Sequence, residues 1–159
     1  MVHKSFMLAG LIGGLIACQP GTRMNETHKK LAEEYLRTLY SGDAAALDNL
    51  VSDEVVSTYP IYQEILGTEA IRGKEALKEF SKGFGQRWSD PDLSIDETIA
   101  EGNDVVVLWS FKATRSDSGE EQHWGGITLI RFDQEGRITL EAGEESLPGP
   151  SGRLKPGEL

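Results

Sequence analysis

The hydrophobic pattern of the chain changes its period once, near residue 92, and this change constrains the fold more than any other feature. Before that point apolar residues recur at helical spacing; Leu31, Tyr35 and Leu39, for example, fall on one side of a helix. Beyond it, apolar and polar residues alternate as they do in half-buried strands. The alternation covers residues 93–101, 104–115, 121–132 and 137–145. Helices followed by strands, rather than interleaved with them, predict an α+β domain.

Three helices are predicted before these strands, at residues 25–40, 44–51 and 73–84. Asn25 or Thr27 can cap the first helix and Asp43 the second, because short polar side chains accept hydrogen bonds from the free N–H groups of a helix start. Residues 54–59 are rich in β-branched side chains and are expected to form an edge strand that ends before Pro60. The expected architecture is a cone, in which three N-terminal helices pack on one curved antiparallel sheet and leave a pocket between them.

The N-terminal segment has the pattern of a secretory signal. Lys4 is followed by an uncharged run from Phe6 to Ala17. This length fits the apolar region of a signal peptide, about 7–15 residues, and falls short of the roughly 20 that a membrane-spanning helix needs. Residues 1–17 are therefore predicted to be a signal peptide that is removed.

The sequence "LIAC" at residues 15–18 resembles the lipobox of bacterial lipoproteins. The resemblance implies cleavage before Cys18 and acylation of both its thiol and its new amino group. Two attachments are needed because a single acyl chain anchors a protein only marginally. Cys18 is the only cysteine, so a disulfide within one chain is excluded. Gln19 follows it, a pattern that in Gram-negative lipoproteins indicates the periplasmic face of the outer membrane.

The rest of the chain is expected to contain one folded domain. Residues 18–25 are interpreted as a tether, residues 26–146 as the domain, and residues 147–159, rich in proline and glycine, as a flexible tail. The net charge of −10 at pH 7 excludes electrostatic binding of nucleic acid and charge-driven attachment to anionic lipid. The lipid on Cys18 is therefore the expected contact with the membrane.

Three segments resemble the nuclear transport factor 2-like superfamily. They are "YLRTLYSGDAAALDNLVSDEVV" at residues 35–56, "IRGKEALKEF" at 71–80 and "LIRFDQEGRI" at 129–138. The superfamily includes ketosteroid isomerases, polyketide cyclases of the SnoaL type and many members that are not enzymes. The resemblance therefore implies the cone fold and leaves the activity open. Members often dimerise through the sheet, so the resemblance also makes a homodimer an option.

The resemblance allows a comparison with the ketosteroid isomerase site. That enzyme uses a carboxylate base, and an oxyanion hole formed by a tyrosine and a protonated aspartic acid. Tyr35 matches the position of the tyrosine, Tyr59 that of the base and Thr128 that of the acid. A tyrosine with a pKa of about 10 is a poor base near neutral pH. The steroid-isomerase mechanism is therefore not expected.

Another acid–base arrangement in the same pocket stays open. His123 can titrate near neutral pH. Glu141 and Glu145 lie on one face of the last strand, which the resemblance implies to be the concave face, and SnoaL-type cyclases place their acid–base carboxylate near this end of the chain. The opposing interpretation is that His123 lies on an outward strand face and that the two glutamates form a solvated edge.

Other chemistries have less support. His28 and His123 lie on different elements and the domain has no cysteine, so no zinc-type cluster and no other metal site is predicted. No nucleophile or phosphate-binding motif is present, and no cofactor is expected. Trp109 and Trp124, on neighbouring strands, are candidates for lining a ligand cavity.

These observations favour a membrane-tethered, non-catalytic module that binds a small, partly apolar molecule. Its cavity is expected to be bounded by Tyr35, Tyr59, Trp109, Thr128 and Glu141. The isomerase base and acid are replaced while the tyrosine and the aromatic residues remain, which favours binding over catalysis. Two alternatives stay open. One is a SnoaL-like isomerase, cyclase or hydrolase that uses His123 or Glu141 as acid or base, and the other is a structural domain that binds a partner on the outer sheet face.

Overall fold

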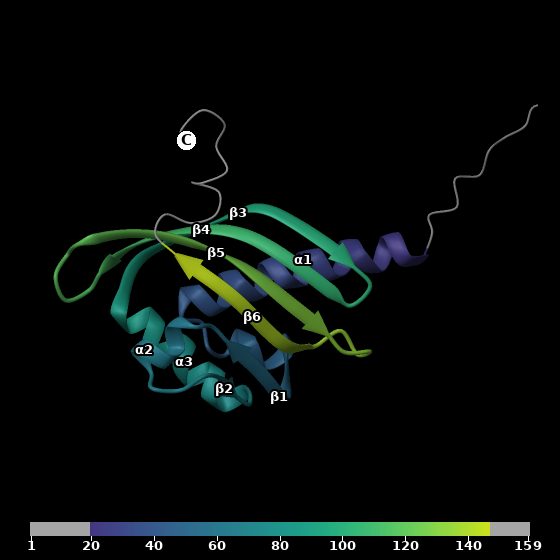
Figure 1. Cartoon of the computed structure of the whole chain (residues 1–159), viewed down its shortest axis with the longest axis horizontal. Helices are drawn as coiled ribbons and strands as arrows, with labels where there is room; N and C mark the ends of the chain where they lie inside the picture. The colour runs from purple at the N-terminus through teal and green to yellow at the C-terminus, as the bar shows by residue number, and fades with distance from the viewer. Residues whose placement is uncertain (1–19, 147–159) are drawn as a thin grey trace, which may run out of the picture.

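The computed structural model describes residues 20–146, which form a curved sheet with helices packed against it (Figure 1). The helices are α1 (Pro20–Ser41), the short 3₁₀ helix η1 (Ala46–Asn49), α2 (Ile61–Ile65) and α3 (Lys74–Arg87). The strands are β1 (Val51–Thr58), β2 (Ile71–Arg72), β3 (Trp88–Glu101), β4 (Asp104–Arg115), β5 (Glu121–Phe132) and β6 (Ile138–Ser146). The predicted α+β class is confirmed, with three α-helices on a six-stranded sheet.

The sheet has the strand order β2-β1-β6-β5-β4-β3 and is mostly antiparallel. β3 to β6 form the predicted meander, in which each strand pairs with the next along the chain. β1 runs parallel to β6 and pairs on its other side with the short β2. The prediction that residues 54–59 form an edge strand is therefore wrong. β1 lies between two strands, and its Val51 and Val55 side chains belong to the core.

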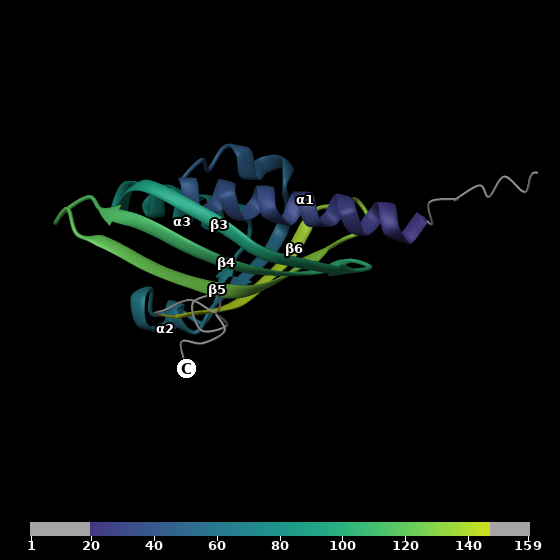
Figure 2. The ribbon, with the colours of Figure 1, turned by 90° about the horizontal axis from the view of Figure 1, so that it is seen from above.

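α1 packs against β3 and β4 through one apolar face. Its buried residues recur at intervals of three and four, the spacing of an amphipathic helix. They are His28, Ala32, Tyr35, Leu36, Leu39 and Tyr40. Figure 2 shows the helix as a layer that runs along the sheet. The helical period found in the sequence therefore decides which face of α1 is buried.

α1 begins earlier than the sequence analysis predicted. The helix starts at Pro20, before the expected caps Asn25 and Thr27 and inside the segment interpreted as a tether. Proline is favourable in the first helical turn because the N–H that it lacks would have no partner there. Residues 21–24 are exposed, so this first turn projects beyond the core. None of the helices formed by residues 20–146 is long and apolar enough to cross a membrane.

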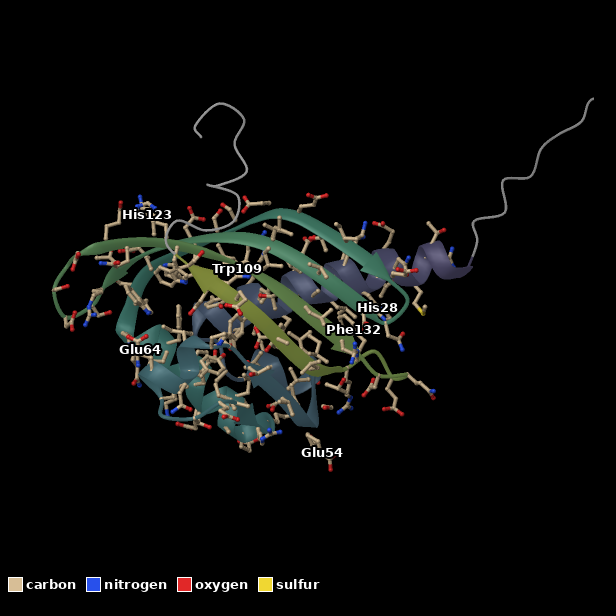
Figure 3. All side chains as sticks on the ribbon, viewed as in Figure 1. His28, Glu54, Glu64, Trp109, His123 and Phe132 are labelled. Atoms are coloured by element: carbon tan, nitrogen blue, oxygen red, sulfur yellow. The ribbon has the colours of Figure 1, made fainter. Side chains whose placement is uncertain are left out.

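The N-terminal half of α1 is bound to the turn between β3 and β4. The Gly102 N–H donates to Oδ1 of Asn25 (3.2 Å), and the Gly102 carbonyl accepts from Nδ1 of His28 (2.9 Å). This second bond requires a proton on Nδ1. The buried His28 ring also stacks on Phe132, with ring centroids 4.4 Å apart (Figure 3). His28 therefore has a structural role.

α1 and α3 cross at a close backbone contact. Gly42 ends α1 with a φ of +81°, which glycine adopts without strain. A Cβ atom on Gly42 would lie 2.7 Å from Cα of Gly85 in α3. At the same crossing the Ser81 hydroxyl donates to a carbonyl of α1 over 2.9 Å. The crossing holds Tyr40 and Phe84 edge to face, with ring centroids 5.1 Å apart.

Two short segments differ from the prediction. The expected second helix is the short 3₁₀ helix η1, preceded by Asp43, whose Oδ1 accepts from the Ala46 N–H over 3.3 Å. α2 and β2 were not predicted, because each is too short to show a hydrophobic period. α2 follows Pro60 directly and places Ile61, Tyr62 and Ile65 beside the end of α3.

Candidate functional site

A cleft of about 360 Å³ opens at the end of the molecule where α1 and α3 end. This volume is at the lower end of the range for small-molecule sites, about 300–1,000 Å³. The cleft is lined by Tyr40, Tyr59, Ile61, Tyr62, Ile65, Phe80, Phe84, Arg87, Trp88, Arg115, Gln122, Trp124, Glu145 and Ser146. The lining thus combines aromatic walls with a few polar groups.

The aromatic walls are held in place by contacts between their own rings. The centroids of Trp88 and Trp124 are 5.0 Å apart, and those of Trp124 and Phe111 are 4.5 Å apart. Phe84 packs edge to face against Phe111 (5.5 Å) and Trp124 (6.4 Å). Aromatic pairs at these separations stabilise one another beyond the area that they bury. The aromatic walls therefore support one another through direct ring contacts.

Glu145 is an acidic residue of the lining. It lies on the inner face of β6, opposite Gly126 of β5. Burial, and next the charge of Glu141, raise the pKa of Glu145 to about 7, although a hydrogen bond with the Trp124 side chain lowers it. A carboxyl group with this pKa is present in both protonation states near neutral pH, as a general acid or base requires.

The raised pKa of Glu145 predicts a pH dependence of stability. The folded state keeps the proton up to about pH 7, whereas the unfolded state loses it near the usual 4.5. The free energy of unfolding is therefore expected to fall between about pH 4.5 and pH 7, by about 2 kcal/mol from this group. Glu145→Gln should remove this part of the slope. Glu144→Gln, at the exposed neighbouring position, should keep it.

Chemical denaturation at pH 5 and pH 7 measures the effect for the parent chain and both variants. If the free energy of unfolding changed equally with pH in the parent and in Glu145→Gln, the raised pKa of Glu145 would be contradicted.

Beneath the cleft, Glu141 is fully buried and accepts three side-chain hydrogen bonds. Its Oε2 accepts from the Tyr35 hydroxyl (2.8 Å) and from the Ser57 hydroxyl (2.5 Å). Its Oε1 accepts from the Tyr59 hydroxyl (3.0 Å). Burial raises the pKa of Glu141 above its usual 4.5, although the bonds from Ser57, Tyr35 and Tyr59 lower it.

Further hydrogen bonds extend this network, and together they determine which group donates and which accepts in each bond. Each hydroxyl has one proton, so Tyr59, having donated to Glu141, accepts from Thr128 (2.7 Å), and Thr128 accepts from the Trp109 indole N–H (2.8 Å). By the same argument Ser57 accepts from Tyr62 (3.0 Å). All of these protons thus point toward the Glu141 carboxylate, and every buried polar side-chain atom in residues 20–146 has a partner.

Two glycines make room for the rings of the network. A Cβ atom on Gly126 would lie 2.5 Å from the Trp109 ring, and one on Gly143 would overlap the Tyr59 ring. Both glycines lie on strands whose inner faces carry the network, at positions paired with Glu145 and Thr128 respectively. The inner face of the sheet can therefore hold two large rings flat against β5 and β6.

The structure brings the five predicted cavity residues together, but not as the lining of a cavity. Tyr35, Tyr59, Trp109, Thr128 and Glu141 form the buried network, and of these only Tyr59 also lines the cleft. This cleft therefore lies beyond the network, with Tyr59 and Tyr62 belonging to both. Trp124 lines the cleft.

His123 lies away from the cleft. It is paired with Lys112 on the outer face of the sheet, its side chain is 62% exposed, and its Nε2 lies 2.8 Å from Glu121. Figure 3 shows it projecting outward from the sheet near the turn between β4 and β5, while Trp109 lies in the middle. The structure therefore supports the opposing interpretation for His123. Of the three candidate acid–base residues, Glu145 lines the cleft.

Sequence reasoning missed most of the cleft lining and part of the network, and four of the missed residues show why. Ser57 and Tyr62 belong to the network, and Tyr40 and Arg87 line the cleft. Ser57 could have been found, because it lies two residues before Tyr59 and side chains alternate along a strand. The other three carried no signal, since their positions depend on α2 and on the crossing of α1 and α3. Residues 20–146 contain no cluster of three or more metal-ligating side chains.

The fold and the cleft define this chain as an α+β cone domain with one open end. A family model described as the SnoaL-like domain matches residues 32–141, more than half of the chain. The chain therefore belongs to the SnoaL-like domain family. A search among curated proteins found no match.

Solved structures confirm the fold. A protein from Jannaschia sp. CCS1, assigned as a SnoaL-like polyketide cyclase, is similar with a TM-score of 0.68 at 12% identity, over 81% of this chain and 92% of that chain. An LEH-like epoxide hydrolase from M. tuberculosis has a TM-score of 0.63 at 18% identity, over 77% and 85%. A nuclear transport factor 2-like superfamily protein from Salmonella enterica has a TM-score of 0.59 at 19% identity, over 87% and 98%. At these sequence identities, the similarity shows a shared fold but not a shared activity.

Proposed function

We propose that the protein binds a small, largely apolar molecule in the cleft at the end of α1 and α3. The observation that carries this proposal is the cleft itself, about 360 Å³ with aromatic residues on several sides and few polar groups. Apolar concave sites with a small number of polar residues are typical ligand sites. The buried network supports the proposal because it fixes Tyr59 and Tyr62, two of the wall residues, by hydrogen bonds on their inner side.

Binding can be measured with N-phenyl-1-naphthylamine, an uncharged aromatic probe that fluoresces in apolar sites. The full chain carrying Cys18→Ala, which cannot be acylated at that thiol, is the parent. Ile65→Arg is expected to weaken binding at least about fivefold, because it places a charge in an apolar wall. Ile99→Arg is the matched control, since Ile99 is similarly exposed and does not line the cleft. Absence of binding, or equal loss in both variants, would refute the proposal.

We further propose that the domain is tethered to the cell envelope through lipid on Cys18. Cys18 lies outside the described residues, so this proposal rests on the "LIAC" motif behind the apolar leader. Metabolic labelling with an alkyne fatty acid should mark the parent chain and not Cys18→Ala. Labelling that persists in Cys18→Ala would exclude this attachment. The location on the periplasmic face of the outer membrane can be tested by fractionating the labelled cells.

A second candidate function is acid–base catalysis by Glu145, for which the specific observation is its pKa of about 7 in the cleft. Glu141 is covered by the network and His123 lies outside, so Glu145 replaces them as the candidate. The relevant reactions are isomerisation, cyclisation and hydrolysis. Turnover of a 3-ketosteroid, a polyketide-like substrate or styrene oxide should fall at least about a hundredfold in Glu145→Gln. Glu144→Gln should keep it, and a parent chain without turnover would leave binding as the function.

Homodimerisation through the sheet stays a proposal based on the family. Ile127 on β5 and Ile99 on β3 are exposed apolar residues of this sheet. Sedimentation of the full chain would show one species of twice the chain mass if the proposal is right.

A further inference from the structure

The polar groups of the cleft gather at one end. Trp88 and Arg115 are paired across β3 and β4, and the N–H of Ser116 donates to the carbonyl of Arg87 over 2.9 Å. Gln122 lies at the start of β5, on the neighbouring strand. Arg87, Arg115 and Gln122 therefore lie at the end of the sheet where β3 and β5 begin and β4 ends.

Much of the rest of the cleft is apolar. Ile61 and Ile65 from α2 and Phe80 from α3 line it, together with the ring faces of Tyr59 and Tyr62. The hydroxyls of these two tyrosines are bonded into the buried network. A ligand that fills the cleft would therefore meet rings, aliphatic side chains and basic groups.

The two arginines differ in how their charge is balanced. Arg115 forms a two-point ion pair with Asp117, with Nε–Oδ1 at 2.9 Å and Nη2–Oδ2 at 2.6 Å, and its guanidinium lies 6.0 Å from the Trp88 ring centroid. Within residues 20–146, the Arg87 guanidinium has no hydrogen-bond, ion-pair or ring partner. Arg87 is exposed and lines the cleft, so a ligand can reach its guanidinium. Its positive charge is therefore available to a ligand.

We propose that the ligand of the cleft is an amphipathic carboxylic acid, whose apolar ring system packs against the aromatic walls while its carboxylate pairs with Arg87. This inference rests on the proposed binding function and adds the class of ligand. A planar guanidinium matches a carboxylate with two parallel hydrogen bonds, which gives both orientation and affinity. A cleft near the lower end of the ligand-site range accommodates a body of roughly two or three rings.

Gln122 and Glu145 complete the polar side of this site. The Gln122 amide can donate to a ligand oxygen. Glu145, with a pKa of about 7, is largely protonated below neutral pH and then donates a hydrogen bond instead of repelling an anion. Both residues lie on the inner face of the sheet, beside Trp124.

The test compares two probes of the same shape, naphthalene-2-carboxylate and naphthalene-2-carboxamide, by calorimetry or by displacement of N-phenyl-1-naphthylamine. The protein is the full chain carrying Cys18→Ala. Arg87→Gln is expected to weaken the carboxylate about tenfold and the carboxamide less than about twofold. Arg87→Lys keeps the charge but not the planar fork, so it should weaken the carboxylate by only about threefold.

Lys82→Gln is the matched control, because Lys82 is an exposed basic residue of the same helix that does not line the cleft. It should leave both affinities unchanged. If Arg87→Gln weakens both probes equally, or neither, the inference is overturned while the binding function stands. If no probe binds the parent chain, the binding function and the inference fail together. Circular dichroism of each variant shows that the fold is kept.

Discussion

Gly143→Ala is expected to lower the free energy of unfolding by about 3 kcal/mol. A Cβ atom at this position would overlap the Tyr59 ring, with Cζ of that ring at 2.8 Å and the Ile127 carbonyl oxygen at 2.9 Å. Carbon atoms pack favourably at about 3.5–4.0 Å, so one of these groups must move. The Tyr59 ring cannot turn aside without breaking its hydrogen bonds to Thr128 and Glu141, and the carbonyl belongs to the β5 backbone.

Urea denaturation of the parent and the variant measures this loss. Gly83→Ala is the matched control: Gly83 lies inside α3 with no atom within 4 Å of its added Cβ, so the same change should stabilise by about 0.5–1 kcal/mol. The cost of Gly143→Ala should shrink when Tyr59 is also changed to leucine, because the two residues are in contact. A loss below about 1 kcal/mol in the single variant would show that the sheet relaxes there and would contradict the packing described.

The change of hydrophobic period was enough to predict the meander of β3 to β6 and the two long helices, α1 and α3. Alternation predicted β4 and β5 at the residues that form them, 104–115 and 121–132. These patterns are reliable because a strand or helix with one buried face shows that face in its sequence. The start of α1 was misplaced although Pro20 itself was a usable signal, since proline is common at the first helical position.

Which residues come together in the site was predictable in part. That they are buried, instead of lining a cavity, was not. Periodicity and the family resemblance placed Tyr35, Thr128 and Glu141 on faces that meet, and the structure joins them in one network. What no pattern could show is that Tyr59 and Tyr62 close over them. That closure depends on α2, which has five residues, and on the space left by Gly143. Residues expected to line a cavity therefore became a satisfied polar core, and the cleft formed on the far side of the two rings.

The pairing of β5 with β6 explains why Glu141 lies in the core while Glu145 lines the cleft. Both lie on the inner face of β6, with Gly143 as the single inner position between them. Glu141 is opposite Ile130, deep in the core, whereas Glu145 is opposite Gly126 near the end of the sheet. Burial raises the pKa of both, but three hydroxyls donate to Glu141. The Glu141 carboxyl group is therefore held by hydrogen bonds in the core, whereas the Glu145 carboxyl group lines the cleft.

Glu141→Leu is expected to lower the free energy of unfolding by about 4 kcal/mol. Leucine leaves the hydroxyls of Tyr35, Ser57 and Tyr59 without their acceptor in a buried site, and each unpaired group costs about 1–3 kcal/mol. Part of that cost is offset because a carboxyl group no longer has to be buried.

The matched variant for Glu141→Leu is Glu141→Gln, which keeps the shape and one acceptor oxygen, and its loss should be near 1 kcal/mol. The two can be compared by urea denaturation at pH 7, with Glu144→Leu as an exposed control that should change stability by less than about 0.5 kcal/mol. If leucine were tolerated as well as glutamine, the hydroxyls would have found other partners. The carboxylate would then not be the centre of the core that the hydrogen bonds indicate.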